Sequence, residues 1–286
     1  MRRLYMEVAA LTYPLPPVLC YHRIGGPLEL GVTRASRTVF ARQMTALARA
    51  GWRTMTLQEF LQHRMGVGAQ HAAPPPTAPR EFFLTFDDGY DSLATQAYPV
   101  LADLGFTATT FLITEYVGKT NTWDARYTWE RLGHLTWDQV EAWRARGFDF
   151  ASHGMTHRRL TWLDDRTVEA ELRHSRDVLL TRLGPQAGCA VAYPFGAVDD
   201  RVLRHARAAG YDLGFGGVKG SRDPLHQSRV PVYCWDVGDT PFGLRHDIVG
   251  ACGRLVAHMA NRCAVGTSFL QARQRIEQQQ VSAADA

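Results

Sequence analysis

The chain has 286 residues, of which 45% are hydrophobic and 21% are charged. This balance is ordinary for a globular protein and excludes a disordered, collagen-like or coiled-coil chain. The net charge of +4 is too small to indicate nucleic-acid binding, and no apolar run is long enough to predict a transmembrane segment. The length allows about two domains or one large barrel.

Strand-like and helix-like segments alternate along the chain. In the first half we expect a strand over 18–24, a helix with Phe40, Met44 and Leu47 that stops at Gly51, a short helix opened by Thr56, a strand over 81–86, a helix from about 92 to 104 and a strand over 108–113. In the second half we expect a helix over 136–147, a strand over 148–152, a helix over about 168–183, strands over 189–195, 213–218 and 229–233, and a last helix with Leu255.

This alternation predicts an α/β fold with a parallel sheet or barrel. The seven predicted strands are continuous apolar runs, as expected for a sheet covered on both faces. We expect an N-terminal extension over 1–13, one barrel domain over 14–270, an exposed Pro- and Ala-rich loop over 66–80 and a frayed polar tail over 271–286. In such folds the active site lies beyond the carboxyl ends of the strands.

The cysteines and the first residues bear on the cellular compartment. The odd number and the spacing of the cysteines fit neither a disulfide framework nor a thiolate zinc site, so we expect free, mostly buried thiols at Cys20, Cys189, Cys234, Cys252 and Cys263. Residues 1–4 are basic, but Glu7 interrupts them and no long apolar stretch follows before Pro14. No signal peptide is therefore predicted, which favours the cytoplasm unless the start site is misplaced.

Polar, titratable residues collect at the predicted strand ends. Asp87 and Asp88 follow one strand, His153 and His157 follow another, and His22 lies within the first. Singly, each has an ordinary interpretation as a turn residue or a core histidine. Together, two histidines four residues apart and a carboxylate suit a divalent ion that polarises a carbonyl and acidifies water, with the second aspartate as a base.

Three short segments resemble the motifs of the NodB-type polysaccharide deacetylases, carbohydrate esterase family 4. They are residues 85–89 (TFDDG), 152–157 (SHGMTH) and 192–196 (AYPFG), and residues 18–24 and 105–111 are similar to flanking family sequence. A zinc protease is disfavoured, because the residue after the first histidine is glycine and not the glutamate that such enzymes use as a base. The resemblance implies a distorted (β/α)7 barrel, in agreement with the seven predicted strands.

The resemblance also implies a reaction and a set of roles. The reaction removes an N-acetyl group from a glycan and releases acetate. Asp87 would be the general base, and Asp88, His153 and His157 would bind one divalent ion, zinc first, with cobalt, nickel, iron or manganese as alternatives. The backbone N–H of Phe195 would stabilise the oxyanion, within a substrate-facing loop made of Tyr193, Pro194, Phe195 and Gly196.

The sequence departs from the family pattern at three places. Gly154 stands where many members have a Ser or Thr that supports the histidine loop, so this support must come from elsewhere. Ala192 stands where an Arg often pairs with the base; Arg229 is a candidate replacement, unless it is a structural strand-edge arginine. His258 does not match the usual motif of the general acid. Tyr21-His22 resembles the N-terminal Tyr-His motif of poly-N-acetylglucosamine deacetylases, so we assign the acid to His22.

Other choices stay open. A sugar-stacking tryptophan could be any of Trp123, Trp129, Trp137 and Trp235, and Trp235 is the best placed, after the last predicted strand. The expected partner is an N-acetylated glycan. The alternatives are an amidohydrolase of a small non-sugar amide or imide, whose relatives also use H-G-x-x-H, and a non-catalytic glycan-binding protein.

Overall fold

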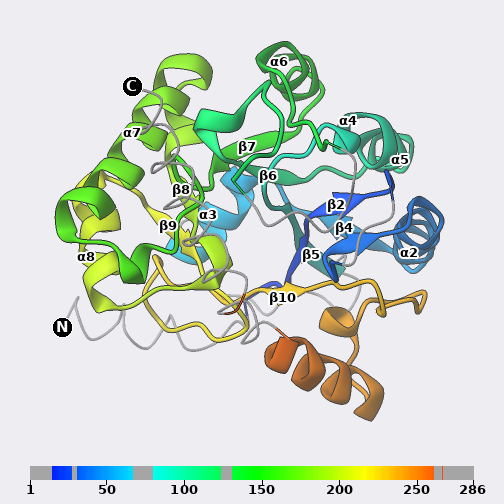
Figure 1. Cartoon of the computed structure of the whole chain (residues 1–286). Helices are drawn as coiled ribbons and strands as arrows, with labels where there is room; N and C mark the ends of the chain where they lie inside the picture. The colour runs from blue at the N-terminus through cyan, green and yellow to red at the C-terminus, as the bar shows by residue number, and fades with distance from the viewer. Residues whose placement is uncertain (1–14, 28–30, 67–79, 124–130, 261–265, 267–286) are drawn as a thin grey trace.

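Eight parallel strands form a curved sheet, with helices packed around its outside (Figure 1). Seven of them follow the order β10-β1-β5-β6-β7-β8-β9, and β4 pairs with β5 beside this path. The computed structural model describes residues 15–27, 31–66, 80–123, 131–260 and 266. Helices α7 and α8 cover the side of β8 and β9, and α2, α4 and α5 cover the opposite side (Figure 1). The expected distorted (β/α) barrel is confirmed as a curled sheet of parallel strands.

The strands are short and almost entirely buried. They are β1 (Val18–Tyr21), β2 (Arg23–Ile24), β3 (Arg34–Ala35), β4 (Trp52–Thr54), β5 (Arg80–Phe86), β6 (Thr109–Leu112), β7 (Asp149–Ser152), β8 (Ala190–Ala192), β9 (Leu213–Phe215) and β10 (Val230–Pro231). The α-helices are α2 (Arg37–Arg49), α3 (Leu57–Met65), α4 (Ser92–Gln96), α5 (Tyr98–Asp103), α6 (Trp137–Arg144), α7 (Asp165–Leu183) and α8 (Asp200–Ala209), and residues 248–260 are also helical. Short 3₁₀ turns cover Thr114–Tyr116, Leu160–Trp162, Pro185–Gly188, Pro194–Gly196 and Phe242–Leu244.

Local sequence signals explain where two of the helices begin. Thr56 accepts a hydrogen bond from the backbone N–H of Glu59, whose side chain bonds back to Thr56. Thr136 and Gln139 form the same reciprocal capping box at the start of α6. Such boxes satisfy backbone donors that a helix start leaves without partners. Both helix starts predicted from the sequence are therefore confirmed.

Several predicted boundaries are wrong. The expected strand over 18–24 is interrupted at His22, between β1 and β2, and the expected helix over 92–104 is two helices, α4 and α5. Pro99, at the start of α5, has no backbone N–H to continue the ladder from α4. The sequence analysis also missed β3 and β4, which are too short to show a period, and α8, although α8 buries Val202, Leu203 and Ala206 at helical spacing.

The register of the sheet brings the first strand to the aspartate pair. In the parallel pairing of β1 with β5, Tyr21 lies opposite Phe86, and the backbone N–H of Asp87 donates to the Tyr21 carbonyl at 2.9 Å. On its other side β1 pairs with β10, where Cys20 lies opposite Pro231. The ends of strands far apart in sequence therefore meet at one edge of the sheet.

Other expectations have mixed outcomes. Four cysteines are free, but only Cys20 and Cys189 are buried while Cys234 and Cys252 are exposed, so the expectation of mostly buried thiols is wrong for this set. Among the described residues, no helix has both the length and the apolar character needed to cross a bilayer. The proposed extension over 1–13, almost all of the loop over 66–80, the tail over 271–286, Trp129 and Cys263 lie outside the described residues.

Candidate metal and catalytic site

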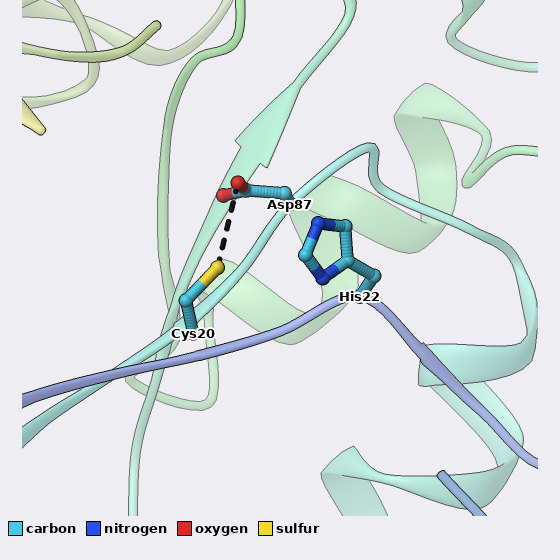
Figure 2. Close-up of side chains that lie close together, drawn as sticks. All are labelled: Cys20, His22 and Asp87. Carbon is cyan, nitrogen blue, oxygen red and sulfur yellow. Dashed lines mark hydrogen bonds between the residues drawn. The ribbon is translucent and has the colours of Figure 1, made fainter. Parts of the chain in front are cut away.

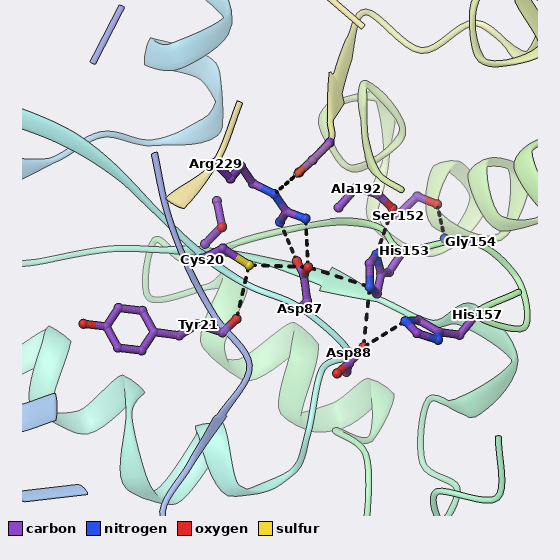
Figure 3. Close-up of polar contacts among 12 residues, drawn as sticks. Cys20, Tyr21, Asp87, Asp88, Ser152, His153, Gly154, His157, Ala192 and Arg229 are labelled. Carbon is purple, nitrogen blue, oxygen red and sulfur yellow. Dashed lines mark hydrogen bonds and ion pairs between the residues drawn. The ribbon is translucent and has the colours of Figure 1, made fainter. Parts of the chain in front are cut away.

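Two adjacent carboxylates leave β5 in different directions. Asp87 faces Arg229, whereas Asp88 faces His153 and His157 (Figure 3). Asp88 has a φ of 70° and His157 a φ of 58°, in the left-handed region that non-glycine residues rarely adopt. Each such residue costs about 1–3 kcal/mol, and strain of this kind clusters at functional sites. The backbone thus gives the neighbouring aspartates different partners, although Oδ2 of Asp87 also lies 3.8 Å from Nε2 of His153.

Asp88, His153 and His157 form a buried cluster whose ligand atoms all lie within 4.8 Å of one another. The Oδ1 atom of Asp88 lies 3.5 Å from Nε2 of His153 and 3.4 Å from Nε2 of His157. These separations are too long for ordinary hydrogen bonds, and Oδ1 makes none with the described residues. The three atoms therefore surround a common position.

The tautomer of His153 supports a cation at that position. Its Nδ1 lies 2.8 Å from the carbonyl oxygen of Ala192, which can only accept, so Nδ1 carries the hydrogen of the neutral ring. The Nε2 lone pair is then directed at the carboxylate of Asp88. Two lone pairs facing each other repel, and a bound divalent ion removes this repulsion. A backbone carbonyl behind a ligating histidine is the usual arrangement in metal sites.

The electrostatics point the same way. Burial alone would lower the pKa of His153, but the carboxylates of Asp87 and Asp88 outweigh burial and raise this pKa above its ordinary value. The pocket therefore attracts positive charge. Two histidines and one carboxylate fit zinc and other first-row divalent ions, and leave coordination positions for water and substrate.

Arg229 holds Asp87 through both oxygens. Its two terminal nitrogens donate to Oδ1 at 2.6 Å and to Oδ2 at 2.8 Å, and its Nε donates to the Gly216 carbonyl at 3.2 Å. Burial would raise the pKa of Asp87, but the Arg229 guanidinium, together with His153 and His22, holds this pKa well below its usual range. Asp87 is therefore an ionised carboxylate that can accept a proton.

Cys20 and His22 approach Asp87 from the neighbouring strand (Figure 2). The Cys20 thiol donates to Oδ2 of Asp87 at 3.4 Å, and ligand atoms of all three residues lie within 4.8 Å of one another. Burial raises the pKa of Cys20 well above its ordinary value, so the sulfur stays protonated as a donor. The sequence analysis missed this contact, because a single cysteine in an apolar strand carries no signal of its own.

The loop over 193–196 lies against the histidines. Phe195 has a φ of 62°, and its ring centroid is 4.8 Å from that of His157. A Cβ on Gly196 would come within 2.7 Å of the Gly217 nitrogen, so this close approach requires glycine. The Tyr193 side chain instead packs in the core, where its hydroxyl donates to the Leu225 carbonyl at 2.9 Å. Tyr193 can contribute to the site only through its backbone.

The tryptophans occupy different environments. Trp123 is buried with its ring centroid 4.0 Å from that of His157, and its indole N–H donates to Nε2 of His134 at 3.1 Å. Trp123 therefore packs behind a candidate ligand and offers no open face to a sugar. Trp137 packs against the core. Trp235 is half-buried beside Tyr233, with ring centroids 4.9 Å apart, and stays a candidate. His258 lies in the helical segment 248–260, drawn in orange in Figure 1.

Known proteins share both sequence and fold with this chain. Residues 75–214 match the family model described as polysaccharide deacetylase. A Bacillus subtilis protein described as a polysaccharide deacetylase, YxkH, is 29% identical over 222 residues, which cover 75% of this chain and 71% of the relative. The poly-beta-1,6-N-acetyl-D-glucosamine N-deacetylase of Staphylococcus epidermidis is 26% identical over 202 residues, 67% of this chain and 64% of the relative.

Solved structures agree with the observed fold. The structure of IcaB from Ammonifex degensii superposes with a TM-score of 0.61 at 25% identity, covering 76% of this chain and 91% of that one. The Streptococcus pyogenes deacetylase PplD, solved in complex with acetate, superposes with a TM-score of 0.66 at 23% identity, covering 80% and 96%. The second likeness shows the fold alone.

Proposed function

Since this chain belongs to the polysaccharide deacetylase family through residues 75–214, we propose that it is a metal-dependent hydrolase that removes N-acetyl groups from an N-acetylglucosamine-type glycan and releases acetate. The observation that carries the proposal is that the two adjacent aspartates have different partners. Asp88 faces two histidine Nε2 atoms, and Asp87 is paired with Arg229. A pure binding protein has no need of such a separated base.

Asp88, His153 and His157 would hold the metal, with zinc as our first choice. When bound, a divalent ion there polarises the acetamide carbonyl and lowers the pKa of a water molecule. Asp87 takes the proton of the attacking water, because its pairing with Arg229 keeps it ionised and fixes the direction of its lone pairs. Arg229 thus pairs with the base, as an Arg at the position of Ala192 does in many family members.

His22 completes the acid–base pair. It lies between β1 and β2, with its Nδ1 buried and without a hydrogen-bond partner among the described residues. As the imidazolium it donates a proton to the departing nitrogen when the C–N bond breaks, which yields acetate and a free amine. The backbone N–H of Phe195 donates to the developing oxyanion. Trp235 is the candidate for stacking against a sugar ring.

The test is acetate release from N-acetylglucosamine monomers, oligomers and polymers, by protein stripped with a chelator and then reloaded with zinc, cobalt, nickel, iron or manganese. We expect release from the glycans only after reloading. A small amide or imide in the same panel tests the alternative on this fold: turnover of that compound without glycan turnover would replace our proposal. Full glycan turnover by the stripped protein would refute the metal requirement.

A further inference from the structure

We propose that Glu171 is a positioning residue that holds the loop carrying the two metal-ligating histidines. Glu171 lies in the middle of α7 and is 1% exposed. Its Oε2 accepts hydrogen bonds from the backbone N–H groups of Met155 and Thr156, both at 2.9 Å, and its Oε1 accepts from the Thr156 hydroxyl. This inference rests on one part of the proposed function, namely that His153 and His157 bind the metal ion.

The loop needs such support because its backbone is left-handed at both ends, a conformation that glycine adopts freely but that costs energy at His157. Gly154 has a φ of 81° and His157 a φ of 58°. The carbonyl groups of Gly154 and Met155 accept from the backbone N–H groups of Thr114 and Glu115, at 3.2 and 3.1 Å. Glu171 in turn accepts the hydrogen bonds of the Met155 and Thr156 N–H groups. Both N–H groups are partly buried, and a donor that loses its partner away from water costs free energy, so removal of the carboxylate would free the loop to relax.

Glu171 also lies beside Gly154. A Cβ at residue 154 would lie 3.4 Å from Oε2 of Glu171, which is an ordinary van der Waals contact, so the φ of 81° is what favours glycine at this position. The Glu171 carboxylate therefore occupies the space beside residue 154. The support that a Ser or Thr at this place gives in many family members comes here from the following helix.

The test compares Glu171→Ala, Glu171→Gln and the control Glu169→Ala, an exposed glutamate two residues earlier on the same helix. The glutamine can accept both backbone N–H groups through its oxygen and donate to the Thr156 hydroxyl through its amide. We expect E171A to bind zinc about 10–100-fold more weakly, the usual effect of losing a group behind a metal ligand. E171Q and E169A should stay within about threefold of wild type. Affinity is measured by competition with a chelator, and the absorption spectrum of the cobalt form reports coordination geometry.

Amide hydrogen exchange in the metal-free protein gives an independent readout. Met155 and Thr156 should be protected in wild type and E171Q and should exchange faster in E171A. Wild-type zinc affinity and an unchanged cobalt spectrum in E171A would overturn the role of Glu171. A wild-type protein that binds no ion at Asp88 would instead overturn the proposed function. If E171A does not fold, Thr156→Val removes the hydroxyl that donates to Glu171. We then expect a severalfold loss of zinc affinity, and no loss would overturn the proposal.

Discussion

Arg229 donates to both carboxylate oxygens of Asp87, at 2.6 and 2.8 Å, although 142 residues separate them in the sequence. They meet because β10 and β5 both pair with β1. The pairing is buried and bidentate, which is the strong form of a charge-assisted hydrogen bond. It gives the Asp87 carboxylate a fixed direction and a fixed charge.

Replacement of Arg229 should impair the base and leave the ion in place. Arg229→Lys cannot make two parallel hydrogen bonds, so we expect a fall in kcat of about tenfold or more with zinc still bound. The pKa of Asp87, held low by Arg229, should rise, which moves the acidic limb of the profile of kcat/KM to higher pH. Arg207→Ala, which breaks an exposed pair with Asp223, is the control. An unchanged pH profile in R229K would contradict the role.

The two aspartates should respond differently to the same change. Asp87→Asn keeps the shape but removes the base, so we expect turnover to fall by roughly 10²–10⁴ with zinc content near that of wild type. Asp88→Asn should lose zinc, because it removes the charged ligand. Elemental analysis and acetate release measure both. Zinc loss in D87N with retention in D88N would mean that the roles are reversed.

His22 should matter only when the leaving group needs a proton. We expect His22→Ala to reduce deacetylation of an acetamide by about 10²-fold or more and to spare an activated acetate ester, whose leaving group departs as an anion. His258→Ala is the matched control and should leave both reactions unchanged. Equal losses of H22A on both substrates would indicate a structural role for His22.

Asp236 should make stability depend on pH. Its side chain is 3% exposed, and burial raises its pKa to about 6, although it accepts a hydrogen bond from the backbone N–H of Phe242. The folded state therefore binds the proton more tightly than the unfolded state does. The protonated Asp236 side chain therefore adds to the free energy of unfolding. This added stability, about 3 kcal/mol, is fully present below about pH 4 and is lost as the pH rises through about 6.

Asp236→Asn removes that titration while it keeps an oxygen for the Phe242 N–H. We expect D236N to be more stable than wild type at pH 7 by an amount of that order, and to lose the decline between about pH 4 and 6. Urea unfolding at a series of pH values measures it. Asp239→Asn, an exposed change in the same loop, is the control. If the stability of D236N falls with pH as steeply as that of wild type, another group is responsible for the pH dependence.

The sequence by itself predicted the chemistry that we propose for this chain. The residue types and spacing of 85–89 and 152–157 indicated a metal and a base, and continuous apolar runs separated by helical segments indicated the parallel sheet, because these signals are local. The tertiary structure decided which distant side chains reach the site. From the sequence, Arg229 could be either the partner of Asp87 or a structural arginine, and no role was predicted for Glu171. A buried contact between remote elements depends on sheet register and helix docking, which no local pattern encodes. The same reason applies to Cys20, whose thiol meets Asp87 only because β1 lies beside β5.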